Sequence, residues 1–503
     1  MSTDLAVDHD GPSDARLALD ALAQRMGAVA QALGVDATVD PSGVGTLVAL
    51  NAAVADSGRR DWAWLVLVGF YGAFPRRADL EEYVRLTELL TPDGVALSLL
   101  TRALPPHVWG RRLRRRLEIQ QSSVLLDVDT CARTERHTGI QRVVRESVPR
   151  WIRRHPDVLP LAWTDDAAGF RHLTPLESDR VLRWNEQGHR DRSEPPADDG
   201  VLVVPWQSRL VLPEVPSPDH CAPLSALAEY SGNRVSAIGY DAIPIVSADV
   251  RPPHEPDNYV NYLTVIKHCD RIAGISVSAA LEFKGFAQML PTQGLEPPLV
   301  TEVVLPGEAP RTELPAPTTS DTPSVVCVGS QEVHKNHLAI LAAADRLWAE
   351  GERFELSFVG GPGWDPLEFE TRIAALQAEG RPVHLRRGVS DTEMWLLYAT
   401  ARFTVFPSLH EGYGLPVAES LSFGTPVITS RYGSMQEIAA AGGGCLLVDP
   451  RDDDSVADGM RRLLRDDDLL ERLRSEARSR PVRDWEAYAD EAWLALTEGT
   501  TAS

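Results

Sequence analysis

The segment from Phe406 to Glu419 constrains this chain more than any other part of its sequence. It reads FPSLHEGYGLPVAE, which is an apolar strand end, a loop broken by two glycines, and a run that predicts the start of a helix. Small residues let backbone N–H groups approach an anionic ligand, and the first turn of a helix adds the positive end of its dipole. Glu411 stands in the loop and Glu419 in the helix, so the sequence predicts an anion site between two carboxylates.

These two carboxylates suit a ligand that has hydroxyl groups at both ends. A carboxylate accepts hydrogen bonds from neighbouring hydroxyls, and a nucleotide sugar offers hexose hydroxyls, a diphosphate and ribose hydroxyls in that order. The string resembles the Glu-x7-Glu signature of retaining glycosyltransferases with the GT-B fold, family 4 in particular. The resemblance implies that Glu411 contacts the hexose and stabilises charge at the anomeric carbon, and that Glu419 holds the ribose. It also implies backbone contacts with the sugar or β-phosphate at Tyr413, Gly414 and Leu415.

Length and composition indicate a globular protein of several domains. A chain of 503 residues is too long for one ordinary core, so two or three domains are expected. Its 43% hydrophobic and 24% charged residues are typical of soluble globular proteins. A net charge of −22 argues against general nucleic-acid binding, which needs a basic face. The five cysteines form no C-x2-C pair, which favours neither a zinc site nor a disulfide framework and suits a reducing cytoplasm.

The sequence predicts neither a secretory signal nor a membrane span. The first residues are polar and acidic, unlike a signal peptide. The longest apolar run, from Trp62 to Phe74, contains two glycines and is shorter than the roughly 20 residues of a spanning helix. We therefore expect a cytoplasmic protein that is soluble or, at most, peripheral at the inner face of the membrane.

The pattern of apolar residues changes along the chain. Residues 1–118 show helical spacing and predict a helical accessory domain without a catalytic constellation. From about Ser122, short buried-strand patterns alternate with helical segments, which predicts parallel strands with helices on both faces. The expected strands are 123–128, 201–204, 234–239, 324–328, 354–359, 383–385, 403–406 and 426–428.

Prolines separate two such α/β halves. Eight of them lie between Pro291 and Pro323, and because proline removes backbone donors and fixes φ, they predict a linker. The predicted fold is α/β: GT-B, with two Rossmann-like domains facing a cleft, plus the N-terminal helical domain. We place the acceptor domain, the linker, the nucleotide-sugar domain and a final helix, which in similar proteins packs back on the acceptor domain, at 119–305, 306–323, 324–478 and 479–503.

Lys335 stands directly ahead of a predicted helix, where an ammonium group can neutralise a diphosphate. A strand end and a turn at Gly329 and Ser330 precede it. The segment resembles the family's Gly-x-x-Glu-x-Arg-Lys-Asn stretch, whose lysine contacts the donor phosphates; Lys335 and Asn336 match, and His334 replaces the arginine. A histidine at that position predicts a mild pH effect. Taken alone, a lysine before a helix is usually solvated surface, but together with the later pair of carboxylates it favours the phosphate role.

Two further glycine-containing segments resemble nucleotide-binding elements of the same family. The turn around Gly361 resembles a Val-Gly-x-x-Gly-Trp turn beside the nucleotide. The block Thr-Gly-Ile-Gln-Arg-Val in the first half resembles one that follows the family's first strand. It implies that Gly139 approaches the diphosphate and that Arg142 contacts phosphate or acceptor. An ordinary turn and a solvated arginine remain the alternatives.

The first half also offers a residue for the acceptor. The element from Tyr240 to Ile245 resembles the family's His-Asp-x-Ile-Pro element, which makes Asp241 the candidate for orienting the acceptor hydroxyl. The resemblance implies front-face substitution with retention, in which the leaving phosphate takes the acceptor's proton, and a fold that works without a bound metal. Asp127 and Asp129 form an Asp-x-Asp pair in the acceptor half, and we expect them to cap neighbouring backbone.

The stretch 111–116 contains five arginines in six positions. It predicts either a docking face for an anionic membrane, at about 1 kcal/mol per basic residue, or a solvated, salt-bridged helix.

By this resemblance we expect transfer of a hexose, with mannose as the guess, from a GDP- or UDP-sugar to a glycan or lipid-linked acceptor of cell-envelope polysaccharide biosynthesis. No cofactor other than this co-substrate is expected. Two alternatives stay open. A GT-B-fold nucleotide-sugar epimerase would turn over without an acceptor, and a non-catalytic sugar-nucleotide-binding or scaffold protein would not turn over at all.

Overall fold

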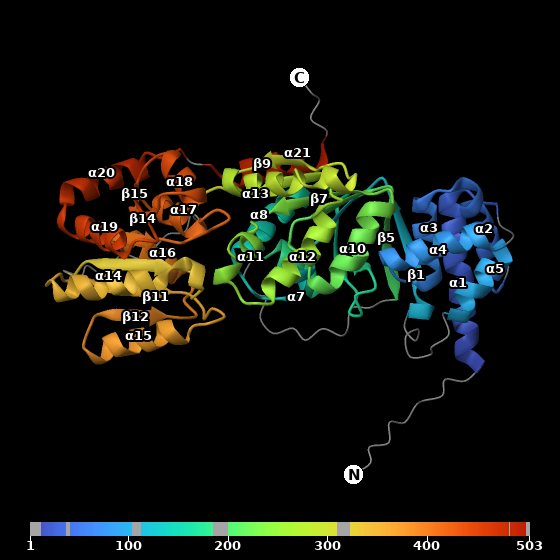
Figure 1. Cartoon of the computed structure of the whole chain (residues 1–503), viewed down its shortest axis with the longest axis horizontal. Coiled ribbons are helices and arrows are strands. Elements are labelled where there is room, and N and C mark those ends of the chain that lie inside the picture. The colour runs from blue at the N-terminus through green and yellow to red at the C-terminus, as the bar shows by residue number, and fades with distance from the viewer. Residues whose placement is uncertain are drawn as a thin grey trace, which may run out of the picture. The chain divides into compact units, whose positions relative to one another are not determined.

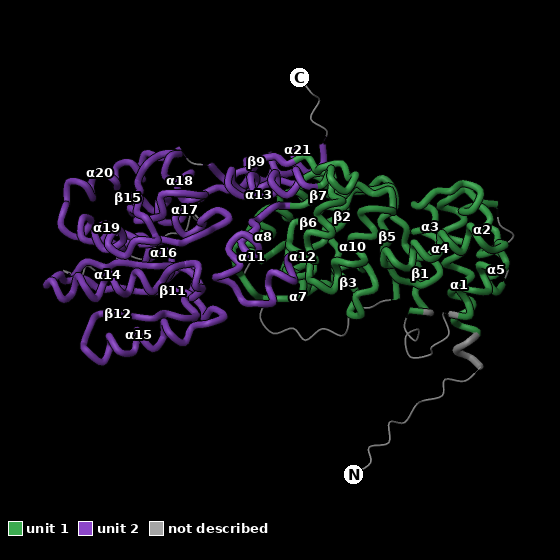
Figure 2. Tube along the Cα trace, in the orientation of Figure 1, with its two compact units in different colours: residues 1–237, 260–271, 290–299 green, residues 238–259, 272–289, 300–503 purple. Residues whose placement is uncertain are grey.

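The computed structural model describes residues 12–36, 41–102, 112–184, 200–308, 322–481 and 483–498. The chain divides into two compact units (Figure 2). Unit 1 comprises residues 1–237, 260–271 and 290–299, and unit 2 comprises residues 238–259, 272–289 and 300–503. The domain boundaries expected at 118, 305, 323 and 478 stay predictions.

Unit 1 begins with helices, which confirms the predicted helical region (Figure 1). Its apolar residues follow helical spacing, and Met26 and Val29 are inaccessible to solvent. Arg25 is buried beside them, and its guanidinium donates to the carbonyl oxygens of Gly69 at 2.7 Å and Arg115 at 3.0 Å. The helices are α1 (Pro12–Leu33), α2 (Val44–Ser57), α3 (Arg60–Tyr71), α4 (Arg77–Leu89) and α5 (Pro92–Arg102).

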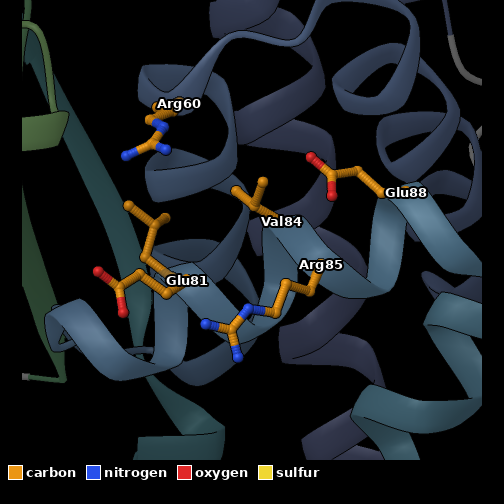
Figure 3. Close-up of a pocket in the computed structure, with 6 residues that line it drawn as sticks. Arg60, Glu81, Val84, Arg85 and Glu88 are labelled. Carbon is orange, nitrogen blue, oxygen red and sulfur yellow. The ribbon is translucent and has the colours of Figure 1, made fainter.

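A hollow of about 320 Å³ lies over α3 and α4 (Figure 3). Its lining is mostly charged, and Glu81 within it forms an ion pair with Arg77. The lining residues are Arg60, Leu80, Glu81, Val84, Arg85 and Glu88.

Two arginines of the basic stretch are engaged within the protein. Arg111 lies outside the described residues, and the following residues form the short 3-10 turn η1 (Arg112–Arg114) rather than the solvated helix that we considered. The guanidinium groups of Arg112 and Arg115 bind the carboxylate of Asp166 at 2.7 and 2.9 Å. Arg115 is only 1% exposed. Salt bridging is thus confirmed for these two residues, and membrane contact stays a prediction.

The first sheet of the described chain has the strand order β1-β5-β4-β3-β2-β6-β7-β8-β9. Its predicted strands are confirmed as β2, β5 and β7, and neighbouring strands pair in parallel at β1–β5, β2–β3, β2–β6 and β6–β7. The prediction of parallel strands is wrong at β4, which is antiparallel to β3 and β5. With three residues, β4 is too short to show a strand period. The strands are β1 (Arg116–Gln121), β2 (Val124–Asp127), β3 (Leu159–Trp163), β4 (Phe170–His172), β5 (Val201–Trp206), β6 (Arg209–Leu212), β7 (Arg234–Gly239), β8 (Arg271–Gly274) and β9 (Leu299–Glu302).

The connections of this half are mostly helical, as predicted for an α/β fold. The boundary between the two units falls within β7, β8 and β9. The helices and short turns are α7 (Asp129–Arg133), α8 (Gly139–Arg154), α9 (Pro175–Leu182), α10 (Pro218–Tyr230), α11 (Ile243–Val246), η2 (Ala248–Val250), α12 (Glu255–Ile266), α13 (Val277–Ala287) and η3 (Leu290–Gln293).

The Asp-x-Asp pair after β2 serves the structure. Asp127 accepts hydrogen bonds from the indole N–H of Trp163 at 3.0 Å and from the backbone N–H of Asp129 at 3.3 Å. Asp129 accepts the backbone N–H of Trp163 at 2.8 Å and also binds Arg133. The expectation that this pair caps neighbouring backbone is confirmed.

The second sheet is parallel throughout, in the order β12-β11-β10-β13-β14-β15. The five strands predicted for this half are confirmed within two residues at each end, and β15 was not expected. The strands are β10 (Ser324–Val328), β11 (Glu355–Val359), β12 (Val383–Arg386), β13 (Phe403–Phe406), β14 (Val427–Ser430) and β15 (Cys445–Val448). The intervening elements are η4 (Val333–Lys335), α14 (His337–Ala349), α15 (Leu367–Ala378), α16 (Asp391–Thr400), α17 (Leu415–Ser422), α18 (Gly433–Ala440), α19 (Asp453–Arg465), α20 (Asp467–Arg478) and α21 (Trp485–Thr497).

The order of this sheet contains a switch point between β10 and β13. From β10 the chain adds β11 and β12 on one side, and it then returns to place β13, β14 and β15 on the other. The loops that leave two strands at such a point diverge, and ligands of open α/β sheets bind in the resulting crevice. Here these are the loops that carry Lys335 and Glu411.

The proline-rich stretch is more structured than expected at one point. Its residues Leu299–Glu302, ahead of the predicted linker at 306–323, form β9, a strand that was not predicted because four residues between prolines show no clear period. Residues 309–321, most of the predicted linker, lie outside the described part. At the other end, Trp485 of α21 is buried and its backbone N–H donates to Glu308 at 3.1 Å. The packing of α21 on the first half stays a prediction.

Two glycine turns of unit 2 lie directly against each other. A Cβ atom at Gly360, where φ is 154°, would come 2.0 Å from the carbonyl oxygen of Gly329. A Cβ at Gly363 would come equally close, 2.0 Å, to the carbonyl oxygen of Gln331. Side chains at these positions would push apart the loops after β10 and β11. A Cβ at Gly361, in contrast, would meet no atom within 4 Å.

We expect Gly360→Ala to destabilise the protein and Gly361→Ala to leave its stability nearly unchanged. Overpacking of a closely packed site costs about 1–3 kcal/mol, whereas a surface substitution stays within about 0.5 kcal/mol. Thermal or denaturant unfolding of the two variants beside the wild type measures this difference. Equal losses in both variants would show that the loops yield to a side chain.

Candidate active site

Two loops of unit 2 bring a lysine and a glutamate into contact at the switch point. Lys335 ends η4, and Glu411 lies in the loop between β13 and α17. The Nζ atom of Lys335 is 2.7 Å from Oε1 of Glu411. The two side chains are only 14% and 12% exposed. Both residues were named from the sequence, and the structure places them together.

The charge of Glu411 depends on this contact. Burial acts to raise the pKa of Glu411, but the Lys335 ammonium, together with His334 and Ser408, outweighs it, and the pKa lies below its ordinary value. The stabilisation from this carboxylate is therefore present above the ordinary pKa of glutamate and is lost as pH falls through the lowered value. Removing Lys335 would leave a buried charge without its partner, a situation that costs about 3–5 kcal/mol.

His334 stays neutral in this site, so the pH effect expected from it is wrong. Burial lowers the pKa of His334 to about 3, and the nearby cations Lys335 and Arg251 act in the same direction. The Nδ1 atom of His334 is 3.1 Å from Nη1 of Arg251, and the same nitrogen of Arg251 is 3.1 Å from Glu332. Arg251 therefore supplies a cation beside the position where the family motif has its arginine. Sequence reasoning missed Arg251, which is 83 residues away.

We expect the imidazole resonances of His334 to show no titration between pH 5 and pH 8. The reason is the lowered pKa, which keeps the ring uncharged over that range. Carbon–proton NMR spectra of histidine-labelled protein would test this, with His334→Gln used to assign the signal. A midpoint near the ordinary value of about 6.5 would contradict the expectation.

Asn336 ties three loops together. Its backbone has φ of 60°, in the left-handed region, where it separates η4 from α14. Its side-chain amide donates to the carbonyl oxygens of Pro407 at 3.3 Å and Pro450 at 2.7 Å, which belong to the loops after β13 and β15. These bonds use both amide hydrogens. Donor binding by Asn336 stays a prediction, and the contacts shown here hold the loops around Lys335.

Two substitutions of Asn336 distinguish the contribution of its side-chain hydrogen bonds from that of its left-handed backbone conformation. Both Asn336→Gly and Asn336→Ala lose the two side-chain hydrogen bonds, but only alanine also carries a Cβ into the left-handed region, which costs about 1–2 kcal/mol. We expect both variants to be less stable than the wild type, and the alanine variant to be the worse by about 1 kcal/mol. Unfolding experiments on the pair measure the gap; an alanine variant as stable as the glycine variant would contradict it.

The start of α17 presents backbone groups beside Glu411. Gly414, with φ of 105°, precedes the first helical residue, Leu415. Tyr413 is 9% exposed, and burial raises its pKa to about 12, so its hydroxyl keeps its proton. Glu419, further along α17, is 5% exposed and accepts a hydrogen bond from the Tyr398 hydroxyl at 3.0 Å. The two carboxylates named from the sequence thus belong to one loop-and-helix element, Glu411 in the loop and Glu419 within α17.

Asp241 lies against the loop that carries Glu411. A Cβ atom at Gly412 would come 2.5 Å from the carbonyl oxygen of Tyr240 and 2.9 Å from Oδ2 of Asp241, so only glycine fits there. The other oxygen of Asp241 accepts the backbone N–H of Ile243 at 3.1 Å. Burial, together with the nearby Glu282 carboxylate, raises the pKa of Asp241 to about 6. Its ionisation therefore changes in mildly acidic solution.

The remaining predicted donor contacts occupy two regions. Gly329 and Ser330 follow β10, and a Cβ at Gly329 would come 3.0 Å from Cδ of Lys335, so this glycine leaves room for the lysine chain. Gly361 borders open space. Gly139 is the first residue of α8, and Arg142 is buried in the same helix; both belong to unit 1. Donor contacts at these residues stay predictions.

Sequence reasoning also gave no role to two residues that adjoin the site. His410 precedes Glu411, and its Nε2 atom is 2.6 Å from Oε1 of Glu282 in α13. His410 was visible in the motif but lacked a partner, and Glu282 is 128 residues away. Neither local spacing nor composition links the two.

Neither a metal-holding cluster nor a membrane-spanning helix occurs within the described ranges. Groups of three or more His, Cys, Asp or Glu side chains placed to hold a metal ion are absent there. The helices of the same ranges also lack one that is both long enough and apolar enough to cross a bilayer.

Comparison with known proteins finds a family match in the second half of the chain. Residues 311–480 match the family Glycosyl transferases group 1. The serotype-specific mannosyltransferase WbdA of Escherichia coli is 25% identical over 63% of this chain and 40% of its own length. The MMP alpha-(1->4)-mannosyltransferase of Mycolicibacterium hassiacum is 38% identical over 21% of this chain and 27% of its own length. The chain thus spans less than half the length of these two curated relatives.

A solved structure shows the same fold. Sucrose-phosphate synthase from Thermosynechococcus elongatus superposes with a TM-score of 0.52 at 17% identity, over 74% of this chain and 97% of that one. This likeness confirms the predicted GT-B fold. The family match itself is confined to residues 311–480.

Proposed function

We propose that this protein is a glycosyltransferase that moves a hexose from a nucleoside diphosphate sugar to a glycan or lipid-linked glycan, with retention of anomeric configuration. The observation that carries the proposal is the buried pair of Lys335 and Glu411 at the switch point of a group 1 domain. A cation beside two carboxylates suits a ligand with a diphosphate between hexose and ribose hydroxyls. Glu419 supplies the second carboxylate.

In this proposal each charged residue acts on one part of the reaction. The Lys335 ammonium has three donors, of which the contact with Glu411 uses one. The others offset negative charge as it develops on the leaving diphosphate. Glu411 stabilises the positive charge at the anomeric carbon. Asp241 accepts a hydrogen bond from the acceptor hydroxyl and orients it.

The bond changes balance without a further co-reactant. The bond between the anomeric carbon and the phosphate oxygen breaks, and the acceptor oxygen bonds to that carbon on the same face. The proton of the acceptor hydroxyl passes to the leaving phosphate oxygen. The step requires no carboxylate nucleophile.

The relatives support a narrower proposal for the substrates. Both curated proteins named above are mannosyltransferases, and we propose a mannose-like hexose carried by GDP or UDP. The acceptor is proposed to be a growing cell-envelope polysaccharide, built in the cytoplasm.

Lys335→Ala is expected to lower turnover by about 10²–10³, the usual loss when one electrostatic donor is removed from a transition state. Lys284→Ala is the matched control, because Lys284 lies in the same unit and its ion pair with Glu302 is exposed. A panel of nucleotide sugars is first screened by thermal shift, where saturation at 100 times Kd adds about 2.7 kcal/mol. The hit then serves as donor in a transfer assay with candidate acceptors.

The outcomes distinguish this proposal from its rivals. Near-native turnover of Lys335→Ala would remove Lys335 from the mechanism. Conversion of the nucleotide sugar without an acceptor would identify an epimerase. Binding without any turnover, over a full set of acceptors, would favour a scaffold.

A further inference from the structure

His410 is held on both sides by residues from other segments of unit 2. Its Nε2 atom is 2.6 Å from Oε1 of Glu282 in α13, and its Nδ1 atom is 2.8 Å from the hydroxyl of Ser247, which follows α11. His410 itself belongs to the loop after β13. The imidazole therefore joins three segments that are far apart in the sequence.

Glu282 extends this connection to the loop after β7. While its Oε1 atom binds His410, its Oε2 atom accepts the backbone N–H of Ala242 at 2.6 Å. The same two loops also touch directly, since Gly412 lies so close to Tyr240 that a Cβ would come 2.5 Å from the carbonyl oxygen. One carboxylate thus holds the loop after β7 and the loop after β13 at the same time.

The surroundings of the imidazole favour its charged form. Burial acts to lower the pKa of His410, but the hydrogen bond to Glu282 and the nearby carboxylates outweigh it, and the pKa is raised. A neutral imidazole keeps both contacts, because it donates from one nitrogen and accepts at the other. What is lost on deprotonation is the charge. The titratable groups around it, from α13, the loops after β7 and β10 and its own loop, are Glu282, Asp241, His334 and Glu411, with Lys335 paired to Glu411.

We propose that His410 is a positioning residue for the transfer reaction, which holds the loop of Glu411 against the loop of Asp241 through its contacts with Glu282 and Ser247. This inference rests on the proposed function, because it assigns both carboxylates to one reaction. The ion pair is complete below about pH 6.5, the ordinary pKa of histidine, and weakens as pH rises through the raised pKa. Turnover falls with it on the alkaline side.

Three variants test the role of the ring. His410→Gln keeps an N–H that can donate to Glu282, whereas His410→Phe keeps none. His254→Gln is the control, because His254 is an exposed histidine of the same unit. We expect His410→Phe to lower kcat about 10- to 100-fold, the usual cost of losing a hydrogen bond to a charged group. The KM for the donor should stay within about 3-fold of the wild-type value, because His410 itself does not contact the donor.

The pH profile separates positioning from mere packing. His410→Gln cannot become charged, so at every pH it should show the reduced kcat that the wild type reaches on the alkaline side, and it should therefore lose the alkaline fall. Its acid limb, which follows Asp241 with a pKa of about 6, should move to higher pH, because a charged His410 acts to lower that pKa. A His410→Gln profile that matches the wild type would overturn the proposal.

Hydrogen exchange gives a readout that does not depend on activity. Peptides covering 241–250 and 408–414 should exchange faster in His410→Phe than in the wild type or His254→Gln. Unchanged exchange in both peptides would overturn the positioning role. If the wild type transfers no hexose but the two peptides respond, the positioning contact stands and the proposed function fails.

Discussion

The arrangement of the sheet and loops of unit 2 depends on the buried contact between Lys335 and Glu411. Two charges removed from water are costly unless they touch, and these two come from loops 76 residues apart in the sequence. The sheet order brings the two loops to one edge. Because Gly360 and Gly363 have no Cβ atom, the loop after β11 packs against the loop after β10 at distances that a Cβ atom would prevent.

The second sheet could be predicted largely from the sequence because its four central strands, β11, β10, β13 and β14, are buried on both faces. Such strands are continuous apolar runs with turn residues at their ends, as in the segment from Val325 to Gly329. The strands that escaped prediction are short or weakly patterned. Both β4 and β9 have three or four residues, too few for a period, and β9 lies among prolines that suggested a linker. Antiparallel pairing at β4 depends on its neighbours rather than on its own residues.

The site was predictable where its residues are close in sequence. Glu411, Glu419 and the start of α17 form one local element, so the local pattern and its resemblance to the family signature together indicated them. Arg251 and Glu282 reach the site from outside that element, and their partners are fixed by tertiary structure. The charge states of His334 and His410 likewise depend on tertiary structure rather than on local sequence. Burial keeps His334 neutral, while a carboxylate partner raises the pKa of His410, and residue type alone gives the two the same expectation.

The shared carboxylate of Glu282 has a consequence for engineering. Loops at the edge of an α/β sheet are usually treated as independent modules that can be exchanged to alter what an enzyme recognises. The loop after β7 is not independent, because the oxygen that holds Ala242 belongs to the same side chain that holds His410. A graft of residues 241–250 from another protein would import a backbone fitted to a different support. Such a chimera would need positions 282 and 410 to be transplanted with the loop.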